Sequence, residues 1–297
     1  MAKLNNKEIS ALIHLLDDPD ELVYSQVRDK FISYGNKVIP HLELAWETAF
    51  DMIMQKRIEE IIHSIQFGGI RKELQSWLNA DQNDLLSAML ILSRYQYPDL
   101  DEEKIKKQIH QIKQDVWLEL NDDLTALEKV KVINHILFEV HNFSGNISNY
   151  HAPQNSYLNT FLETKKGNPV SLGILYIVIC NELKIPVYGV NLPEHFICAY
   201  VDEFYNFFNL NKDEYNQESI LFYINPFSKG VLFSKKDIDQ FLEQLKLKPK
   251  PMFYKPCSNI EIIQRVLRNL IYSYEKLGHT EKTEELGILL SEITKNN

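Results

Sequence analysis

Two polar residues near the middle of the chain, His195 and Asn225, are of the types that enzymes pair for acyl transfer. His195 follows Leu192-Pro-Glu and begins a segment with strand-like composition, while Asn225 ends a later segment of the same kind. An amide oxygen beside a His can accept a hydrogen bond from the ring and select its tautomer, so that the other ring nitrogen can act as a base. The pair predicts a site at the ends of two neighbouring strands, provided that a nucleophile is also present.

The nucleophile is the missing part of this set. A Cys at a helix start would be activated there, but the chain reads Gly167-Asn168-Pro169 before its most apolar helical segment. Cys180 lies about two and a half turns beyond Ser171 and faces the other side of the helix, and Cys198 points to the opposite strand face from His195. Cys257 lies outside this region. Ser171 either replaces the nucleophile, with His195 as its base, or only caps the helix locally.

The helix start itself is a second candidate site. Asn168 is a favoured N-cap residue and Pro169 suits the first helical position. The free backbone N–H groups of such a start carry partial positive charge, which can hold an oxyanion or a carboxylate. The segment that follows, to about Leu183, is apolar nearly all round and should be buried. The pattern therefore predicts either an anion site here or simply a well-capped core helix.

The elements around this centre are helices on both sides and strands in the middle. Residues 1–75 and 82–141 show apolar stripes of helical period, and residues 141–154 are rich in Asn, Ser and Gly, which predicts a long loop. After Pro186 the period shortens towards two. Strands are expected at 187–190, 196–200, 205–208, 221–224 and 231–233, and helices again at 259–293. The sequence thus predicts an α+β protein with an antiparallel sheet.

Both ends of the chain resemble known helical repeats. The stretch LLDDPDELVYSQVRDKFISYGNKVIPHL has the helix, Asp-Pro turn, helix and Gly order of a HEAT-type repeat, and a plain helical bundle is the alternative. Near the other end, two helical segments joined at Leu277-Gly278-His279 resemble one tetratricopeptide unit. A single unit of this kind predicts a docking hairpin rather than a peptide-binding array.

The bulk properties limit the kinds of partner. The 297 residues carry a formal net charge of -9 with a pI near 5.5, which argues against nucleic-acid binding. No apolar run is long enough to span a membrane, no leader is expected at the N-terminus, and three unpaired cysteines favour the cytoplasm. The nine histidines lack metal-ligand spacing, and no phosphate or dinucleotide fingerprint is present. We expect no cofactor and no metal.

The central motifs carry a family resemblance. Asn155-Ser-Tyr-Leu, Lys166-Gly-Asn-Pro-Val-Ser-Leu172, Leu192-Pro-Glu-His-Phe196 and Ile224-Asn-Pro-Phe227 resemble the core of bacterial SirB-type proteins, a branch of the transglutaminase-like superfamily. The resemblance covers roughly residues 80–290. It implies a transglutaminase-like, or papain-like, core of a buried helix on an antiparallel sheet. It also implies that His195 and Asn225 occupy the superfamily's His and Asp positions, and that the nucleophilic Cys position falls at or beside Pro169.

Together with the repeat-like ends, this resemblance predicts three parts, the first of which lies outside the SirB-type match. Residues 1–80 form a HEAT-like region, 81–250 a SirB-type domain with helices at 82–141 and a core at 155–234, and 251–297 a tetratricopeptide-like hairpin. We predict a vestigial catalytic site at His195, Asn225 and Ser171. The residues that we expect to bind a ligand or partner are Asn168, Asn155, Glu194 and His151.

Because the Cys is absent, the sequence favours a non-catalytic cytoplasmic protein that acts as a regulatory or protein-binding scaffold, with its helical ends as partner surfaces. One alternative is a hydrolase or acyl transferase that uses Ser171, His195 and Asn225. The other is a binder of a small anionic ligand in the old cleft. The expected partner is another protein, with neither nucleic acid nor a membrane involved.

Overall fold

A computed structural model describes residues 5–80, 84–202 and 219–295, and the chain divides into two compact units. The first unit comprises Met1–Ser76 with Arg94–Pro98, and the second comprises Trp77–Ser93 with Asp99–Asn297. The predicted strand at 205–208 lies outside the described residues. Within the described ranges, no helix is both long and apolar enough to cross a membrane. The division of the sequence into 1–80, 81–250 and 251–297 has boundaries other than those of these two units, and it remains a prediction.

The first unit is a small helical domain, whose helices are α1 (Asn6–His14), α2 (Glu21–Tyr34), the short η1 (Gly35–Val38), α3 (Ile39–Thr48) and the first part of α4 (Met52–Ala80). Side chains of Asn5 and Asp20 cap α1 and α2, and Gly35 ends α2 with a φ of 64°. The buried Arg57 guanidinium on α4 donates to the backbone oxygens of Leu16 and Asp18 at 2.8 Å. This one side chain thereby fixes the turn between α1 and α2.

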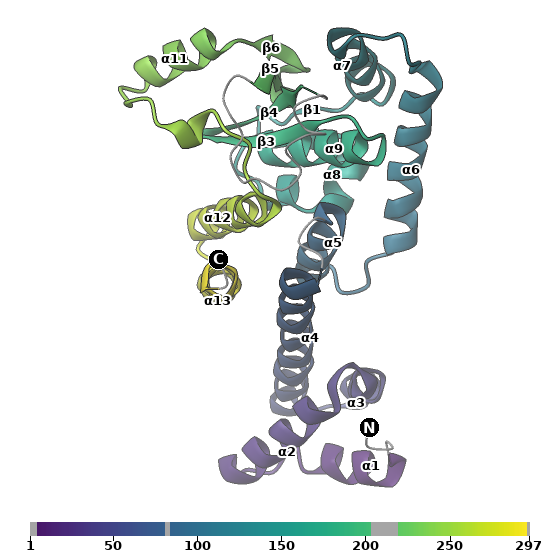
Figure 1. Cartoon of the computed structure of the whole chain (residues 1–297). Coiled ribbons are helices and arrows are strands. Elements are labelled where there is room, and N and C mark those ends of the chain that lie inside the picture. The colour runs from purple at the N-terminus through teal and green to yellow at the C-terminus, as the bar shows by residue number, and fades with distance from the viewer. Residues whose placement is uncertain (1–4, 81–83, 203–218, 296–297) are drawn as a thin grey trace. The chain divides into compact units, whose positions relative to one another are not determined.

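The second unit begins with helices and then forms its sheet (Figure 1). Its helices before the sheet are the end of α4, α5 (Leu85–Gln96) up to Ser93, α6 (Glu102–Glu119), α7 (Ala126–Asn134), the π-helical η2 (His135–Val140), the 3₁₀ turn η3 (Pro153–Ser156), α8 (Leu158–Thr164) and α9 (Pro169–Glu182). The predicted loop at 141–154 contains the start of η3 and the two-residue strand β1 (Ser144–Gly145), which pairs in parallel with β2 (Lys166–Gly167). This pairing ties the loop to the start of α9.

The main sheet has four antiparallel strands in the order β3-β4-β5-β6. They are β3 (Val187–Leu192), β4 (His195–Val201), β5 (Ile220–Asn225) and β6 (Val231–Phe233). The registers pair Leu192 with His195, Cys198 with Ile224, and Asn225 with Val231. The described chain is mostly helical with a small antiparallel sheet, which confirms the prediction of an α+β protein with an antiparallel sheet.

Helix α9 lies against one face of this sheet. Every side chain from Pro169 to Cys180 is buried, as the apolar composition of this segment predicts. The helix approaches β4 closely at Gly173, where an added Cβ would lie 2.5 Å from the Phe196 ring. The opposite face packs on α11 (Lys235–Gln244), and the buried side chains there are Val190, Leu192, Ile197, Ala199, Tyr223, Ile238, Leu242 and Tyr254.

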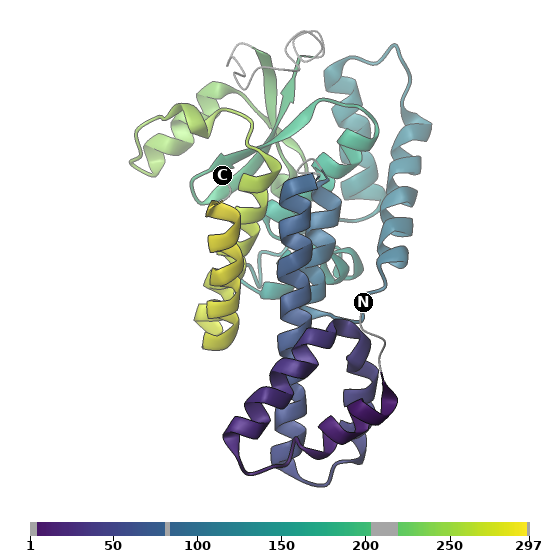
Figure 2. The ribbon, with the colours of Figure 1, turned by 60° about the horizontal axis from the view of Figure 1, so that its bottom comes forward.

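The chain ends in two helices, α12 (Asn259–Leu277) and α13 (Thr280–Lys295), which follow the short turns η5 (Pro226–Ser228) and η6 (Pro251–Phe253). They run side by side, and Figure 2 shows α13 along the length of its neighbour. Gly278 joins them with a φ of 76°, the left-handed conformation that favours Gly at a helix end. Helix α12 also contacts α9 and η3, which places one of its faces beside the start of α9.

Candidate functional site

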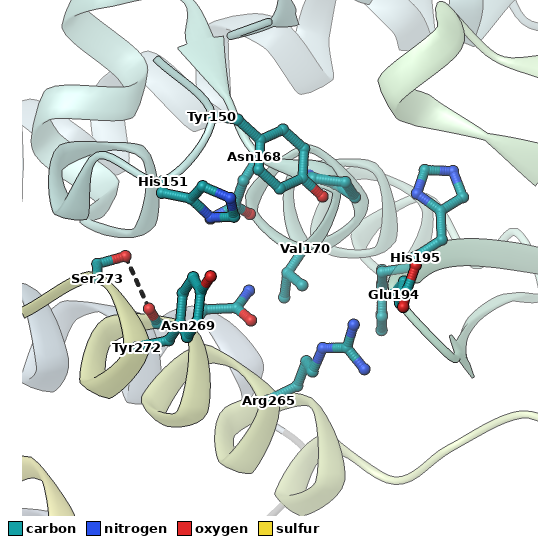
Figure 3. Close-up of a pocket in the computed structure, with 12 residues that line it drawn as sticks. Tyr150, His151, Asn168, Val170, Glu194, His195, Arg265, Asn269, Tyr272 and Ser273 are labelled. Carbon is teal, nitrogen blue, oxygen red and sulfur yellow. Dashed lines mark hydrogen bonds between the residues drawn. The ribbon is translucent and has the colours of Figure 1, made fainter. Parts of the chain in front are cut away.

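A pocket of about 590 Å³ lies where four segments of the second unit meet (Figure 3). The loop before η3, the first turn of α9, the β3–β4 hairpin and one face of α12 form its walls. The lining residues are Tyr150, His151, Asn168, Pro169, Val170, Glu194, His195, Phe196, Arg265, Asn269, Tyr272 and Ser273. This volume is in the range of pockets that hold small ligands or single side chains of a partner. Four of the predicted residues are therefore in one place: His151, Asn168, Glu194 and His195.

The start of α9 is capped as the sequence predicts. Asn168 Oδ1 accepts a hydrogen bond from the Ser171 backbone N–H at 2.9 Å, and Ser171 Oγ accepts one from the Asn168 N–H at 3.0 Å. The Asn168 amide also donates to Ser156 Oγ at 2.9 Å. These bonds hold the first turn of α9 rigidly against η3, with Pro169 and Val170 facing the pocket. The cap residue itself is thus both structural and part of the pocket wall.

Ser171 is not placed as a nucleophile. Its side chain is buried, is absent from the pocket lining, and donates its own hydrogen bond to the Asn168 carbonyl at 3.1 Å. Among the described residues, no hydrogen bond joins Ser171 to His195. The structure therefore does not assemble the alternative Ser171-His195-Asn225 set, because the hydroxyl is used by the capping box instead.

His195 and Asn225 do come together. They lie on the same face of the sheet in neighbouring strands, because Cys198 pairs with Ile224 and side chains alternate along each strand. Burial lowers the pKa of His195, a hydrogen bond with the Asn225 side chain raises it in opposition, and the charge of Arg265 lowers it further. The Asn225 oxygen also accepts from the Phe227 and Ser228 backbone N–H groups at 3.1 and 3.3 Å. Asn225 thus supports the turn after β5 and does not line the pocket.

None of the three cysteines replaces the missing nucleophile. Cys180 and Cys198 are fully buried and Cys257 is half-buried. Burial raises the pKa of each of these thiols, so that the reactive thiolate is disfavoured. Within the described ranges, no group of three or more His, Cys, Asp or Glu side chains is placed to hold a metal ion.

The loop before η3 supplies one wall through Tyr150 and His151. Their rings meet edge to face at 5.0 Å between centroids, and the His151 ring meets Tyr272 of α12 at the same distance. Asn155, which we predicted as a binding residue, does not line the pocket. It is buried, and its amide donates to the backbone oxygens of Asn149 and Tyr150 at 2.8 and 3.0 Å. Asn155 therefore positions the wall rather than forming it.

The hairpin wall is set by a tight turn at Pro193-Glu194. Glu194 has a φ of 58°, the left-handed conformation, which costs a non-glycine residue about 1 kcal/mol. Its side chain is exposed at the rim of the pocket. The two-residue connection places His195 directly at the rim, as the first residue of β4.

Sequence reasoning missed Arg265, the one guanidinium among the pocket's lining residues. It extends from α12 towards the space between Val170 and the hairpin (Figure 3). Its Nη1 donates to the Leu192 carbonyl at 3.4 Å, and it forms no ion pair with the described residues. Burial lowers the pKa of this group, which means that its charge is only partly solvated. The helical spacing of Arg265, Asn269 and Tyr272 was a signal, but the sequence did not show which side of α12 faces the site.

Comparisons with known proteins agree with this fold. A family model described as the transglutaminase-like superfamily matches residues 103–268. A UPF0162 protein of Xylella fastidiosa strain 9a5c is 26% identical over 220 residues, which are 71% of this chain and 72% of that protein. A UPF0162 protein of strain Temecula1 is 34% identical over 113 residues, 38% of this chain and 40% of that one.

A eukaryotic protein also matches part of the chain. F-box only protein 21 of Mus musculus is 26% identical over 158 residues, which are 53% of this chain but only 23% of that protein. No solved structure matches the chain. The family model spans more than half of the 297 residues and includes the helix start, the hairpin and most of α12. The chain belongs to the transglutaminase-like superfamily.

Proposed function

We propose that this protein is a non-catalytic transglutaminase-like protein that binds a partner polypeptide, and that the pocket receives a carboxylate of that partner. The observation that carries this proposal is Arg265, a partly buried guanidinium that lines the pocket and has no carboxylate partner among the described residues. A buried charge without a counter-charge is costly. A ligand that supplies the counter-charge would recover that cost on binding.

The other pocket walls suit the same ligand. The first turn of α9 contributes partial positive charge, and Asn269 and Tyr150 add polar groups that can bond to carboxylate oxygens. Arg binds carboxylates through two parallel hydrogen bonds, which fixes their orientation. His195, whose pKa is lowered by burial, is predominantly neutral at neutral pH and can donate or accept. The pocket therefore favours an anion with defined geometry over a purely apolar ligand.

The rim of the pocket favours a polypeptide over a free small anion. His151 and Tyr272 are exposed and stack edge to face, which offers an aromatic surface beside the opening. Aromatic residues of this kind are enriched in protein interfaces. The similarity to a segment of F-box only protein 21 is in keeping with a protein-binding role.

The environments of the four candidate nucleophiles, Ser171 and the three cysteines, support the non-catalytic part of the proposal. Acyl transfer needs an activated hydroxyl or thiol within hydrogen-bond reach of its base. Ser171 is bonded to the Asn168 backbone, and the three thiols are disfavoured as thiolates. His195 and Asn225 remain as a pair that shapes the pocket edge.

We further infer that the chain belongs to the SirB-type branch, on the central motifs quoted above. The Asp-Pro and Gly breaks in the first unit support a HEAT-like origin for residues 1–80. The antiparallel pair α12 and α13 supports a tetratricopeptide-like hairpin in residues 251–297, after a SirB-type domain at 81–250. Three free cysteines support a reducing compartment such as the cytoplasm.

The test is an array of immobilised peptides of random sequence, made once with free C-terminal carboxylates and once amidated. The full-length protein should prefer peptides that carry Asp, Glu or a free C-terminus. Arg265→Gln should weaken binding of the preferred peptides by about tenfold or more, because hydrogen bonds to charged groups contribute roughly 1.5–3 kcal/mol. Arg268→Gln is the matched control, since Arg268 is exposed on the same helix and does not line the pocket.

Four outcomes would contradict the proposal. Binding without preference for carboxylates, or an equal loss in Arg268→Gln, would remove Arg265 from the interaction. Complete displacement of the peptides by glutarate at micromolar concentration would identify a small-anion binder instead. Labelling by serine-directed acylating probes that disappears in both Ser171→Ala and His195→Ala would show a working nucleophile.

A further inference from the structure

A second surface, in the first unit and independent of the pocket above, has the features of a docking groove. It has a volume of about 340 Å³ and is formed by one face of α3 and one face of α4. Its walls are Glu43, Trp46 and Glu47 from α3, and Glu59, Ile62 and His63 from α4. The spacing of these residues follows the helical period on both helices. We call this surface the α3–α4 groove.

The groove contains two large apolar side chains, Trp46 and Ile62, and further exposed apolar side chains follow α3 along the chain. Trp46 is 39% exposed, and its indole N–H donates to Glu59 Oε1 at 2.8 Å, which fixes the ring across the groove. Beyond the end of α3, Phe50 is fully exposed, Met52 is 81% exposed and Ile53 is 62% exposed. Such a run of large apolar side chains in contact with water marks an interaction site in a soluble domain.

The charge around the groove is negative and mostly uncompensated. Residues 43–63 contain five carboxylates and two cationic side chains other than His. Lys56 pairs with Glu60, one of these five carboxylates, at 3.9 Å, while Arg57 pairs with Glu21, outside this range, at 2.7 Å. Glu43 and Glu47, by contrast, form no ion pair with any residue that the structure describes. The groove therefore presents apolar surface bordered by free carboxylates.

From this combination we propose that the α3–α4 groove binds a basic amphipathic helix of a partner protein. A groove between two helices accepts a third helix through apolar side chains spaced at three and four residues. Trp46 would serve as the aromatic anchor, while Lys or Arg side chains on the edges of the partner helix would pair with Glu43 and Glu47. The same carboxylates oppose an anionic lipid surface, because like charges would meet there.

The experiment uses the full-length protein and a synthetic probe. A fluorescein-labelled, 14-residue Leu/Lys amphipathic helical peptide is titrated with the protein, and anisotropy is followed at low and at physiological salt. A second peptide carries Glu in place of every Lys. We expect saturable binding of the Lys peptide that weakens with salt, and binding of the Glu peptide at least about tenfold weaker.

Variants locate the binding surface. Glu43→Lys with Glu47→Lys should weaken binding of the Lys peptide by about tenfold, and Trp46→Ala by a similar factor or more, because truncation of a central aromatic is costly. The charge reversal changes only exposed side chains and tests the groove even where Trp46→Ala fails to fold. The matched control is Glu281→Lys with Glu284→Lys on α13, where both side chains are exposed. This control should leave the affinity within about twofold.

Several results would overturn the proposal. They are the absence of saturable binding, equal binding of the two peptides, or an equal loss in the α13 control. Light scattering that shows concentration-dependent dimers abolished by Trp46→Ala would assign the groove to a second copy of this chain. Co-sedimentation with vesicles of phosphatidylcholine and phosphatidylserine that depends on Phe50 and Met52 would assign it to a membrane.

Discussion

Ser171 and Asn168 satisfy each other's backbone N–H groups at the start of α9, at 3.0 and 2.9 Å. In this superfamily member, the hydroxyl nearest to the expected nucleophile position is thus committed to a helix cap. The capping role uses the same short side chain and the same first turn that a nucleophile would use. If Ser171 is a capping residue, its replacement should lower the free energy of unfolding, and serine-directed acylating probes should not label it.

Replacing Ser171 by Ala should destabilise the fold. The Asn168 N–H would lose its acceptor in a buried setting, and we expect a loss of about 1–2 kcal/mol in the free energy of unfolding. Urea denaturation of the full-length protein measures it. The control is Ser258→Ala, which removes the same capping box at the exposed start of α12 and should cost less, about 0.5–1 kcal/mol. A Ser171→Ala protein as stable as wild type would contradict the capping role.

The close approach of α9 to β4 should make Gly173 intolerant of a side chain. A Cβ there would lie 2.5 Å from the Phe196 ring, so the Gly173→Ala change should cost about 1–3 kcal/mol through overpacking. Gly287 on α13 has no neighbouring atom within 4 Å of an added Cβ. Gly287→Ala should therefore stabilise the protein by about 0.5–1 kcal/mol, through helix propensity alone.

Thermal or urea unfolding of both glycine variants checks this pair of predictions. Opposite signs are expected for two identical substitutions, each inside a helix. If both variants changed stability in the same direction by the same amount, the contact between Gly173 and Phe196 would not be the determining factor.

The stability of the protein should depend on the protonation of His195. Burial lowers its pKa below the ordinary value of 6.5, so the folded state binds the proton less readily than the unfolded state. The contribution of His195 is therefore fully present above its unfolded pKa and is lost as the pH falls through the folded pKa. We expect His195→Gln to flatten part of the decline in unfolding free energy between about pH 7 and pH 5.

Histidine Cε1–H resonances give a direct check on the same group. The signal that disappears in His195→Gln should titrate below 6.5 in the wild type. Asn225→Ala should lower the pKa of His195 further, because the opposing hydrogen bond is removed. A pKa that rises in Asn225→Ala would contradict the pairing of these two residues.

Asn155 should affect ligand binding without touching the ligand. Asn155→Ala removes the amide that holds the backbone oxygens of Asn149 and Tyr150, so that Tyr150 and His151 lose their fixed positions. We expect a loss of about 1–3 kcal/mol in stability, because buried polar partners are left unpaired. Affinity for the carboxylate peptides selected on the array should fall as well, with the preference for carboxylates unchanged because Arg265 remains.

The control for this prediction is Asn149→Ala, which changes an exposed side chain and leaves the backbone acceptor in place. Denaturation and peptide anisotropy, measured on the same samples, separate the two effects. If Asn155→Ala altered neither stability nor affinity, the loop would not depend on this side chain.

The local sequence alone determined much of this protein. The period change after Pro186 located four of the strands, and Asn168-Pro169 located the start of α9 with its cap, because capping and side-chain alternation are local properties of the chain. The apolar composition of α9 also predicted the burial of Pro169 to Cys180. The placement of His195 beside Asn225 could be anticipated because both residues lie at strand ends in adjacent hairpins.

Only the tertiary structure decided what these residues do. From its sequence position, the Ser171 hydroxyl could bond either to His195 or to the Asn168 backbone. The structure shows the bond to the Asn168 carbonyl. Asn155 was expected to line the pocket, but it instead holds the loop that carries Tyr150 and His151. Arg265 was not predicted, and it reaches the pocket from a helix about 70 residues beyond His195. A helix has one periodic pattern but several possible neighbours, and long-range packing selects which of its polar residues face a ligand.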